Sequence, residues 1–128
     1  MAISWACGRR KKIMSNKLYR GVRKEHVPKV YVDAEELSLD AAKKLRPSEA
    51  TVEFGYFGDG PSQTSLAILL DATEDEQNSL KYMHEFKAEF IAPADYQLGF
   101  TILQSQIKSW MEKKIAGSSG STGWAWGI

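Results

Sequence analysis

The chain has 128 residues, which is enough for one domain with a hydrophobic core and too few for two. Its composition is that of an ordinary globular protein, with 43% hydrophobic and 26% charged residues. The single cysteine, Cys7, excludes an internal disulfide framework and a cysteine-rich metal site. No apolar run approaches the roughly 18 residues of a membrane-spanning helix. The sequence therefore predicts a cytoplasmic protein that binds no membrane.

The net charge of +1 is unevenly distributed along the chain. Residues 1–16 contain the basic run from Arg9 to Lys12 and no acidic residue, a charge of +4, whereas residues 17–128 carry −3. The absence of periodicity predicts a disordered basic arm over 1–16, to which attraction for phosphate would be largely confined. Met14 stands directly before the first predicted strand and is an alternative start of the protein.

Two short runs with alternating apolar residues predict a β-hairpin. They are Lys17–Arg23 and Pro28–Asp33, joined by a turn over 24–27. The following segment, 35–47, fits either a short helix opened by Ser38 or an extended segment. In both interpretations Pro47 ends it.

A third strand is predicted over Ala50–Phe54, where apolar residues again alternate. The glycine-rich turn 55–60 then leads into a helix, because Pro61 suits a first helical position. The buried stripe of this helix is expected to hold Leu66, Leu69, Leu70 and Thr73.

Two further amphipathic helices are indicated by apolar residues at spacings of three and four. The first is opened by a predicted capping box, Thr73-Glu-Asp-Glu76, and is terminated by Pro93; its stripe is Leu80, Met83, Phe86 and Phe90. A short extended piece over 96–102 precedes the second, whose stripe is Leu103, Ile107, Trp110, Met111 and Ile115.

These elements predict an α+β fold in which a small antiparallel sheet of three to four strands packs against two to three helices. The domain is expected over 17–115. Residues 116–128 are predicted to form a flexible Gly/Ser linker and an aromatic C-terminal tail.

Three motifs carry a family resemblance: Tyr19-Arg-Gly-Val-Arg23, Val52-Glu-Phe-Gly-Tyr56 with Gly58-x-Gly-Pro61, and Ser65-Leu-Ala-Ile-Leu-Leu-Asp71. The sequence resembles an uncharacterised family of small prokaryotic and phage domains over about residues 17–115. It departs from that pattern at Phe54, where an indole is common, at Phe57, where glycine is common, and at Leu103, where a threonine cap is frequent. The resemblance implies the fold and a phage or mobile-element setting, and it supplies no catalytic residues.

Features that could indicate catalysis or a cofactor have simpler structural interpretations. The start of the helix at Pro61 could hold an anion, but no lysine follows the glycines and Asp59 would repel a phosphate. His84 and His26 have no metal-ligand spacing, and the acidic segment 71–76 is explained by helix capping. We therefore predict no enzyme activity, no metal and no cofactor.

The predicted binding residues lie on the hairpin and at the C-terminus. The hairpin face is expected to present Tyr19, Arg20, Arg23, Lys24 and Tyr31 to a partner. Trp124 and Trp126, after the Gly/Ser linker, resemble a tethered docking peptide, although a tail that folds back on the sheet, or a non-native end, would give the same pattern.

These residues predict a small accessory protein that binds a host or viral macromolecule stoichiometrically. A protein partner is favoured over nucleic acid. The alternative is a nucleic-acid-binding module, in which the basic arm neutralises phosphates and the hairpin tyrosines stack on bases.

Overall fold

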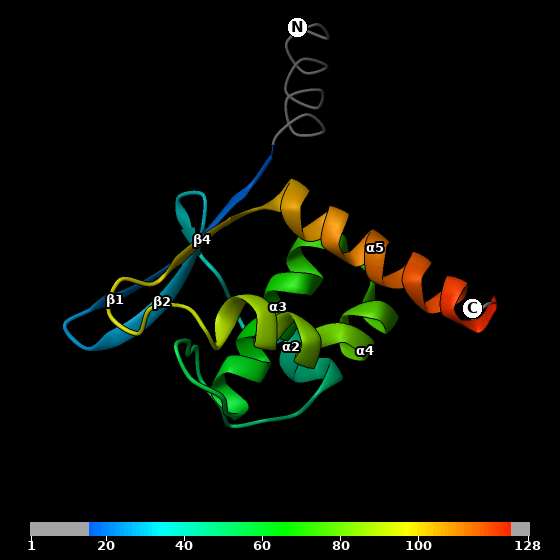
Figure 1. Cartoon of the computed structure of the whole chain (residues 1–128). Coiled ribbons are helices and arrows are strands. Elements are labelled where there is room, and N and C mark those ends of the chain that lie inside the picture. The colour runs from blue at the N-terminus through cyan, green and yellow to red at the C-terminus, as the bar shows by residue number, and fades with distance from the viewer. Residues whose placement is uncertain (1–15, 124–128) are drawn as a thin grey trace, which may run out of the picture.

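The computed structural model of the chain describes residues 16–123, and the side chains of 16–117. It has the predicted α+β fold, in which a four-stranded antiparallel sheet with the strand order β3-β2-β1-β4 packs against helices (Figure 1). The strands are β1 (Leu18–Lys24), β2 (Val27–Val32), β3 (Glu35–Glu36) and β4 (Phe100–Leu103). The helices are α2 (Asp40–Leu45), α3 (Asp59–Thr73), α4 (Glu76–Phe86), the π-helix η1 (Lys87–Ile91) and α5 (Gln104–Gly123).

Strands β1 and β2 form the predicted hairpin, whose tip extends beyond the helices (Figure 1). Alternation along β1 divides its side chains between two faces of the sheet. The inner face, toward the helices, contains Tyr19 and Gly21, which pair with Val32 and Val30 of β2. The opposite, outer face carries more exposed side chains, among them Arg20. This division decides which of the predicted hairpin residues a partner could reach.

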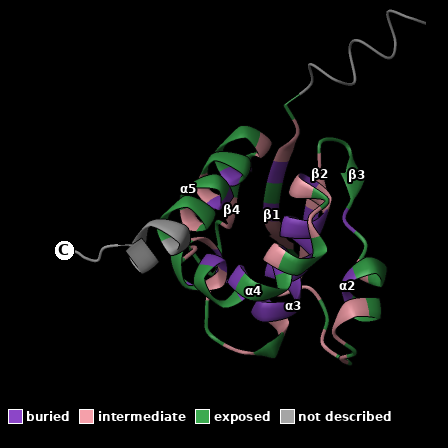
Figure 2. Ribbon diagram, turned by 90° about the vertical axis from the view of Figure 1, so that its right-hand side faces the viewer, coloured by how far each residue is buried: buried purple, intermediate pink, exposed green. Residues whose placement is uncertain are grey.

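Helix α3 is the centre of the domain rather than an amphipathic surface helix (Figure 2). All its residues from Pro61 to Leu70 are buried, including a polar run over 62–65. Each polar side chain of this run has a hydrogen-bond partner, as buried polar groups require. For example, the Thr64 hydroxyl accepts a 2.9 Å hydrogen bond from the Glu53 backbone N–H, and Ser65 donates one of 2.8 Å to the Pro61 carbonyl.

Helices α4 and α5 meet around an aromatic cluster. The Trp110 ring contacts Phe86, Phe90 and Tyr82 edge to face, the favoured geometry for aromatic pairs. The indole N–H donates a 3.0 Å hydrogen bond to Glu89, and Lys114 forms ion pairs with Glu85 and Glu89. The predicted stripe of α4 is confirmed at Met83 and Phe86, whereas Leu80 is exposed and Tyr82 takes a buried place instead.

The predicted third strand over Ala50–Phe54 is wrong. This segment is irregular, because its backbone bonds to helical elements instead of to a strand. The Glu53 N–H donates to the Thr64 side chain, and Gly55, the residue directly after the segment, donates a 2.9 Å hydrogen bond to the Ile91 carbonyl. The additional strands come from Glu35–Glu36 and Phe100–Leu103, so the 35–47 segment contains both alternatives: a short strand, then a helix.

Three predicted element boundaries also need correction. Helix α3 begins at Asp59, two residues before Pro61, which is tolerated because the first helical residues have no intrahelical acceptor for their N–H groups. The N-cap of α4 is Asp75, since Glu74 ends α3 in a left-handed conformation with φ 56°. Helix α5 runs to Gly123, although a linker was predicted from residue 116; extending an existing helix needs no new nucleus.

No helix in the described part of the chain is long and apolar enough to cross a membrane.

Candidate functional site

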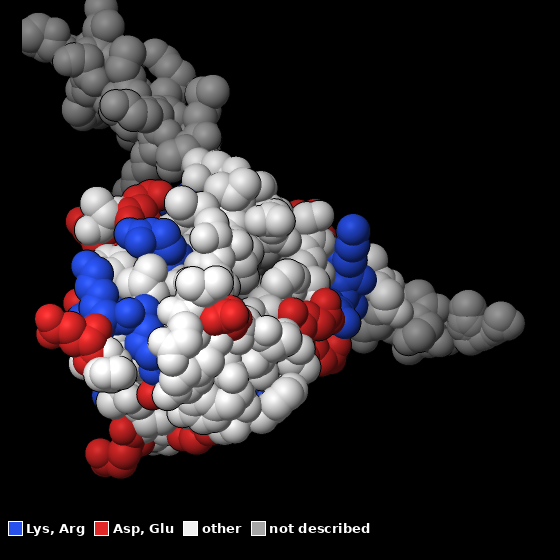
Figure 3. Space-filling model, turned by 60° about the vertical axis from the view of Figure 1, so that its left-hand side comes forward, with Lys and Arg blue, Asp and Glu red and all other residues white. Residues whose placement is uncertain are grey.

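The structure separates the predicted hairpin site into two groups on opposite faces of the sheet. Arg20, Lys24 and Tyr31 lie together on the outer face, where the Arg20 guanidinium and the Lys24 ammonium stand 5.5 and 5.7 Å from the centre of the Tyr31 ring. Both cations are exposed. Figure 3 shows Lys and Arg side chains beside Asp and Glu at the hairpin side of the molecule, next to a broad area without charge.

Tyr19 is buried on the inner face, so the prediction that its ring contacts a partner is wrong. Its side chain is 0% exposed, and its hydroxyl donates a 2.6 Å hydrogen bond to Asp71 of helix α3. Burial and the nearby Asp71 carboxylate raise the pKa of the Tyr19 phenol far above its ordinary value. Tyr19 therefore acts as a neutral hydrogen-bond donor between sheet and helix, with Lys17 forming a 3.4 Å ion pair to the same carboxylate.

Arg23 is also withdrawn from the surface, since only 3% of its side chain is exposed. Its guanidinium lies 3.7 Å from the centre of the Tyr96 ring and 4.8 Å from that of Phe54. It donates hydrogen bonds to the backbone carbonyls of Tyr96 (2.8 Å) and Phe54 (3.1 Å), and it lies 3.4 Å from the Glu53 carboxylate. Arg23 thus joins two loops that are about forty residues apart.

The loops joined by Arg23 carry an exposed cluster, which we call the aromatic loop surface: Tyr56, Phe57, Tyr96 and Leu98. Phe57 is 67% and Leu98 82% exposed, and the Tyr56 and Tyr96 rings lie 6.4 Å apart. Gly55 holds the two loops at close range: its φ is +90°, and a Cβ there would lie 2.8 Å from the Tyr96 Cα. Sequence analysis missed this surface, although the tyrosine and phenylalanine inside a glycine-rich turn were a signal for it.

The start of helix α3 is not a vacant anion site. The Asp59 carboxylate accepts hydrogen bonds from Arg46 (2.6 Å) and Ser48 (2.5 Å), and these bonds lower its pKa. Lys87 donates a 2.8 Å hydrogen bond to Ser62, whose hydroxyl donates to the Gly58 carbonyl. The structural interpretation of the glycine-rich turn thus agrees with these contacts.

The other features noted in the sequence do not come together as a reactive site in the described part of the chain. His84 is exposed, with a pKa lowered by partial burial and then by Lys87 and Arg46, and His26 lies in the hairpin turn. Among the described residues, no cluster of three or more histidine, cysteine and acidic side chains could hold a metal ion. Cys7, the basic run 9–12, Trp124 and Trp126 lie outside the described residues.

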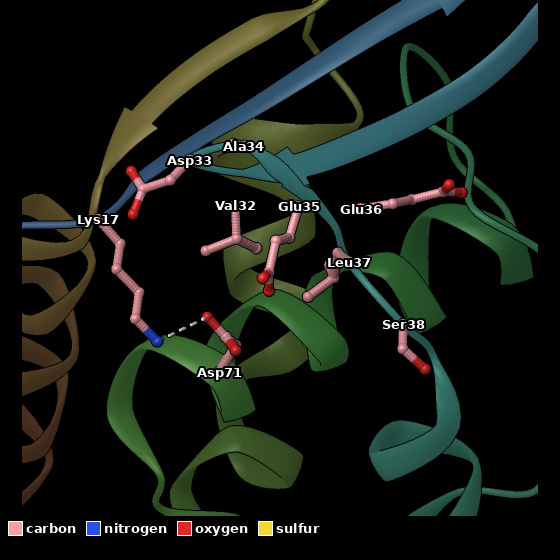
Figure 4. Close-up of a pocket in the computed structure, with 9 residues that line it drawn as sticks. All are labelled: Lys17, Val32, Asp33, Ala34, Glu35, Glu36, Leu37, Ser38 and Asp71. Carbon is pink, nitrogen blue, oxygen red and sulfur yellow. Dashed lines mark hydrogen bonds and ion pairs between the residues drawn. The ribbon is translucent and has the colours of Figure 1, made fainter.

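A groove runs between the β2–β3 end of the sheet and helices α2 and α3. It consists of two adjoining hollows of about 430 and 630 Å³ that share Lys17, Leu37, Ser38 and Asp71. Figure 4 shows Val32, Glu35 and Leu37 in the space between the sheet and α3, with Lys17 reaching Asp71. The lining includes two lysines, Lys17 and Lys44, and seven acidic residues: Asp33, Glu35, Glu36, Asp40, Asp71, Glu74 and Glu76. The Glu36 carboxylate turns to Lys29 on the outer face, which leaves six carboxylates in the groove and a net charge of −4.

These observations define a small α+β domain in which helices cover one face of the sheet. Its candidate sites are the outer face of the hairpin, the aromatic loop surface and the acidic groove. The model of a family of unknown function, DUF6166, matches residues 19–113, and the chain belongs to this family. The predicted resemblance is therefore confirmed. No curated protein and no solved structure matches the chain.

The structure also explains the motifs on which the resemblance depends. In the first motif, Tyr19 and Arg23 are anchors, and a side chain at Gly21 would collide with the Phe100 ring. The last residue of the third motif, Asp71, accepts the Tyr19 hydrogen bond. These motif residues therefore serve contacts within the domain, whereas Arg20 of the first motif and Tyr56 of the second are exposed.

Proposed function

We propose that the protein acts by stoichiometric binding of a protein partner through the aromatic loop surface, without catalysis. One observation carries the proposal: three aromatic rings and a leucine are exposed on two loops that meet at the Tyr56–Tyr96 ring pair. Tyrosine and phenylalanine are enriched in the cores of protein interfaces, whereas an isolated exposed leucine would need no explanation.

The way the loops are held supports this proposal. Arg23 and Gly55 fix both loops against the sheet, so little conformational entropy remains to be lost when a partner binds. The buried Arg23 also supplies charge-assisted hydrogen bonds, which are stronger than neutral ones. A preorganised apolar surface of this kind is suited to a specific protein contact.

Nucleic-acid binding is less well supported than the sequence suggested. Burial of Tyr19 and Arg23 removes one of two tyrosines and one cation from the predicted stacking surface. Tyr31 remains, but its ring already contacts Arg20 and Lys24. The outer face therefore offers a single tyrosine, where single-strand binders use several stacking rings. The phage or mobile-element setting stays a prediction, which gene neighbourhood would test.

The experiment compares binding of a partner recovered from the native host by two matched variants. Phe57→Ser with Leu98→Ser changes the aromatic loop surface, and Leu80→Ser with Val27→Ser changes exposed apolar residues elsewhere. With the purified partner, we expect the first pair to raise the Kd by about 30-fold or more. This corresponds to a loss of about 2 kcal/mol of binding free energy, which is typical of interface hot spots. The control pair should leave the Kd within a few-fold of wild type.

Two results would contradict the proposal. Equal Kd values for wild type and the Phe57→Ser, Leu98→Ser variant would exclude the aromatic loop surface as the interface. A recovered complex that nuclease treatment removes, with binding that weakens steeply as salt rises, would show that the ligand is nucleic acid instead.

A further inference from the structure

We propose that the acidic groove is the docking site for this chain's own N-terminal segment, residues 1–15. The groove and the segment have opposite charge. The side chains that face the groove have a net charge of −4, and the basic run from Arg9 to Lys12 contributes +4 with no acidic residue beside it. Within the described residues, an ion pair engages one of the six groove carboxylates, Asp71 with Lys17. Five carboxylates therefore remain for cations from elsewhere.

The apolar parts of segment and groove also match. The floor of the larger hollow is formed by apolar side chains from β3's end, α2 and α3: Leu37, Ala41, Leu45, Ala67 and Leu70. In the segment, Ile3 and Trp5 precede the basic run by a few residues. The apolar floor is complementary to the apolar residues Ile3 and Trp5, and the acidic rim is complementary to the basic run that follows them.

The point of attachment brings the segment to the groove. Lys17, the second described residue, lines both hollows (Figure 4), and Asn16 before it exchanges two hydrogen bonds with Ser105 of α5, so the segment joins the domain one residue away from the groove's lining. Lys12 lies five positions before Lys17, an extended length of about 17 Å. A short tether gives its ligand an effective concentration in the millimolar range, so even a weak contact fills the groove. The proposal is independent of the aromatic loop surface.

Cys7 makes a direct test possible in the full chain, because it is the single cysteine. A nitroxide attached to Cys7 broadens the NMR signals of amides close to it. We expect loss of amide signals at Leu37, Ser38 and Ala41, which line the groove, and full signals at Arg20 and Lys24 on the outer face. Raising the salt to 1 M, where the screening length falls from about 10 to about 3 Å, should restore the groove signals.

Matched charge reversals distinguish docking in the groove from a general attraction of the basic segment to acidic residues on the surface. Glu35→Lys with Asp40→Lys, both in the groove, should restore the signals at low salt. Glu49→Lys with Glu112→Lys makes the same change in charge at exposed positions outside the groove and should leave the broadening intact.

Three outcomes would overturn the proposal. Full groove signals at low salt, with a spectrum of the folded protein, would show that the segment does not dock there. Broadening centred on Arg20 and Lys24 would place the segment on the outer face instead. Broadening of the groove that disappears when labelled protein is diluted into unlabelled protein of the same chain would mean that the segment belongs to a second copy.

Discussion

The 2.6 Å hydrogen bond from the Tyr19 hydroxyl to the Asp71 carboxylate joins the first strand of the sheet to the central helix. Both residues belong to the sequence motifs on which the resemblance rests, and the two side chains meet between sheet and helix although fifty-two positions separate them. The bond fixes the distance between sheet and helix α3 at one edge of the acidic groove, whose lining includes Asp71. Its removal should therefore affect the fold before it affects a binding surface.

Tyr19→Phe is predicted to lower the free energy of unfolding by about 1.5 to 3 kcal/mol, the range for hydrogen bonds to charged groups. The ring would still fill its place in the core, so the loss of stability measures the contribution of the hydroxyl group. Tyr31→Phe is the matched control, because Tyr31 lies on the outer face and should change stability by less than about 0.5 kcal/mol. Urea unfolding measures both. Equal stability of the two variants would contradict the assignment of Tyr19 as an anchor.

Alkaline pH provides a second test of the same contact. Burial, then the hydrogen bond and charge of Asp71, raise the pKa of Tyr19 above its ordinary value of 10.0. The folded state therefore holds the phenol proton more tightly than the unfolded chain. This contribution to stability is complete below the unfolded pKa and is lost as the pH rises from about 10 through the higher folded value.

We expect the wild-type free energy of unfolding to fall more steeply above pH 10 than that of Tyr19→Phe. Unfolding in urea at several alkaline pH values measures the difference, and comparing the tyrosinate absorbance of folded wild type and Tyr19→Phe shows whether Tyr19 is the tyrosine that stays protonated. Parallel pH dependences for the two proteins would show that Tyr19 titrates normally.

Arg23→Lys tests whether the guanidinium, rather than a positive charge, joins the two loops. A lysine keeps the charge but has no planar fork to serve the Tyr96 and Phe54 carbonyls while stacking on the Tyr96 ring. We predict a loss of about 1.5 to 3 kcal/mol in the free energy of unfolding. Arg20→Lys on the exposed outer face is the control and should be nearly neutral. A neutral Arg23→Lys would mean that the loops are held by other contacts.

The sequence predicted correctly those elements whose structure depends on the pattern of their own residues. The hairpin followed from alternation of apolar residues over 17–33, and the stripe containing Met83 and Phe86 followed from helical spacing. These patterns depend on neighbours within one element. The strand predicted at 50–54 had the same local pattern, yet the Glu53 N–H bonds to Thr64 and that of the following Gly55 bonds to Ile91, contacts that no local pattern contains.

The candidate site was harder to predict for the same reason. Alternation placed Arg20 and Arg23 on one basic hairpin but did not show which face the helices cover. Arg23 is buried because Tyr96, over seventy residues away, covers it. The aromatic loop surface and the acidic groove likewise combine residues from distant segments, so local patterns could at most indicate one part of each.

A last prediction concerns the start of helix α4, where the sequence favoured Thr73 as the cap and the structure has Asp75. The Asp75 carboxylate accepts hydrogen bonds from the Asn78 side chain (2.7 Å) and backbone N–H (3.1 Å), and these lower its pKa. Thr73 instead donates to the Leu69 carbonyl of the preceding helix. Asp75→Ala should cost about 1 kcal/mol of stability, the usual loss of an N-cap.

Asp75→Asn separates the cap from its charge. The amide oxygen still accepts the backbone N–H, so most of the stability at neutral pH should remain. The wild-type carboxylate stabilises the fold above its unfolded pKa of about 3.9, and that part is lost as the pH falls through the lower folded value. Asp75→Asn should therefore be less sensitive to acid than wild type. The N-cap side chain accepts hydrogen bonds from the first free N–H groups of the helix, so truncating the N-cap residue costs the most stability. A larger loss for Thr73→Ala than for Asp75→Ala in urea unfolding at neutral pH would therefore show that the cap predicted from the sequence is correct.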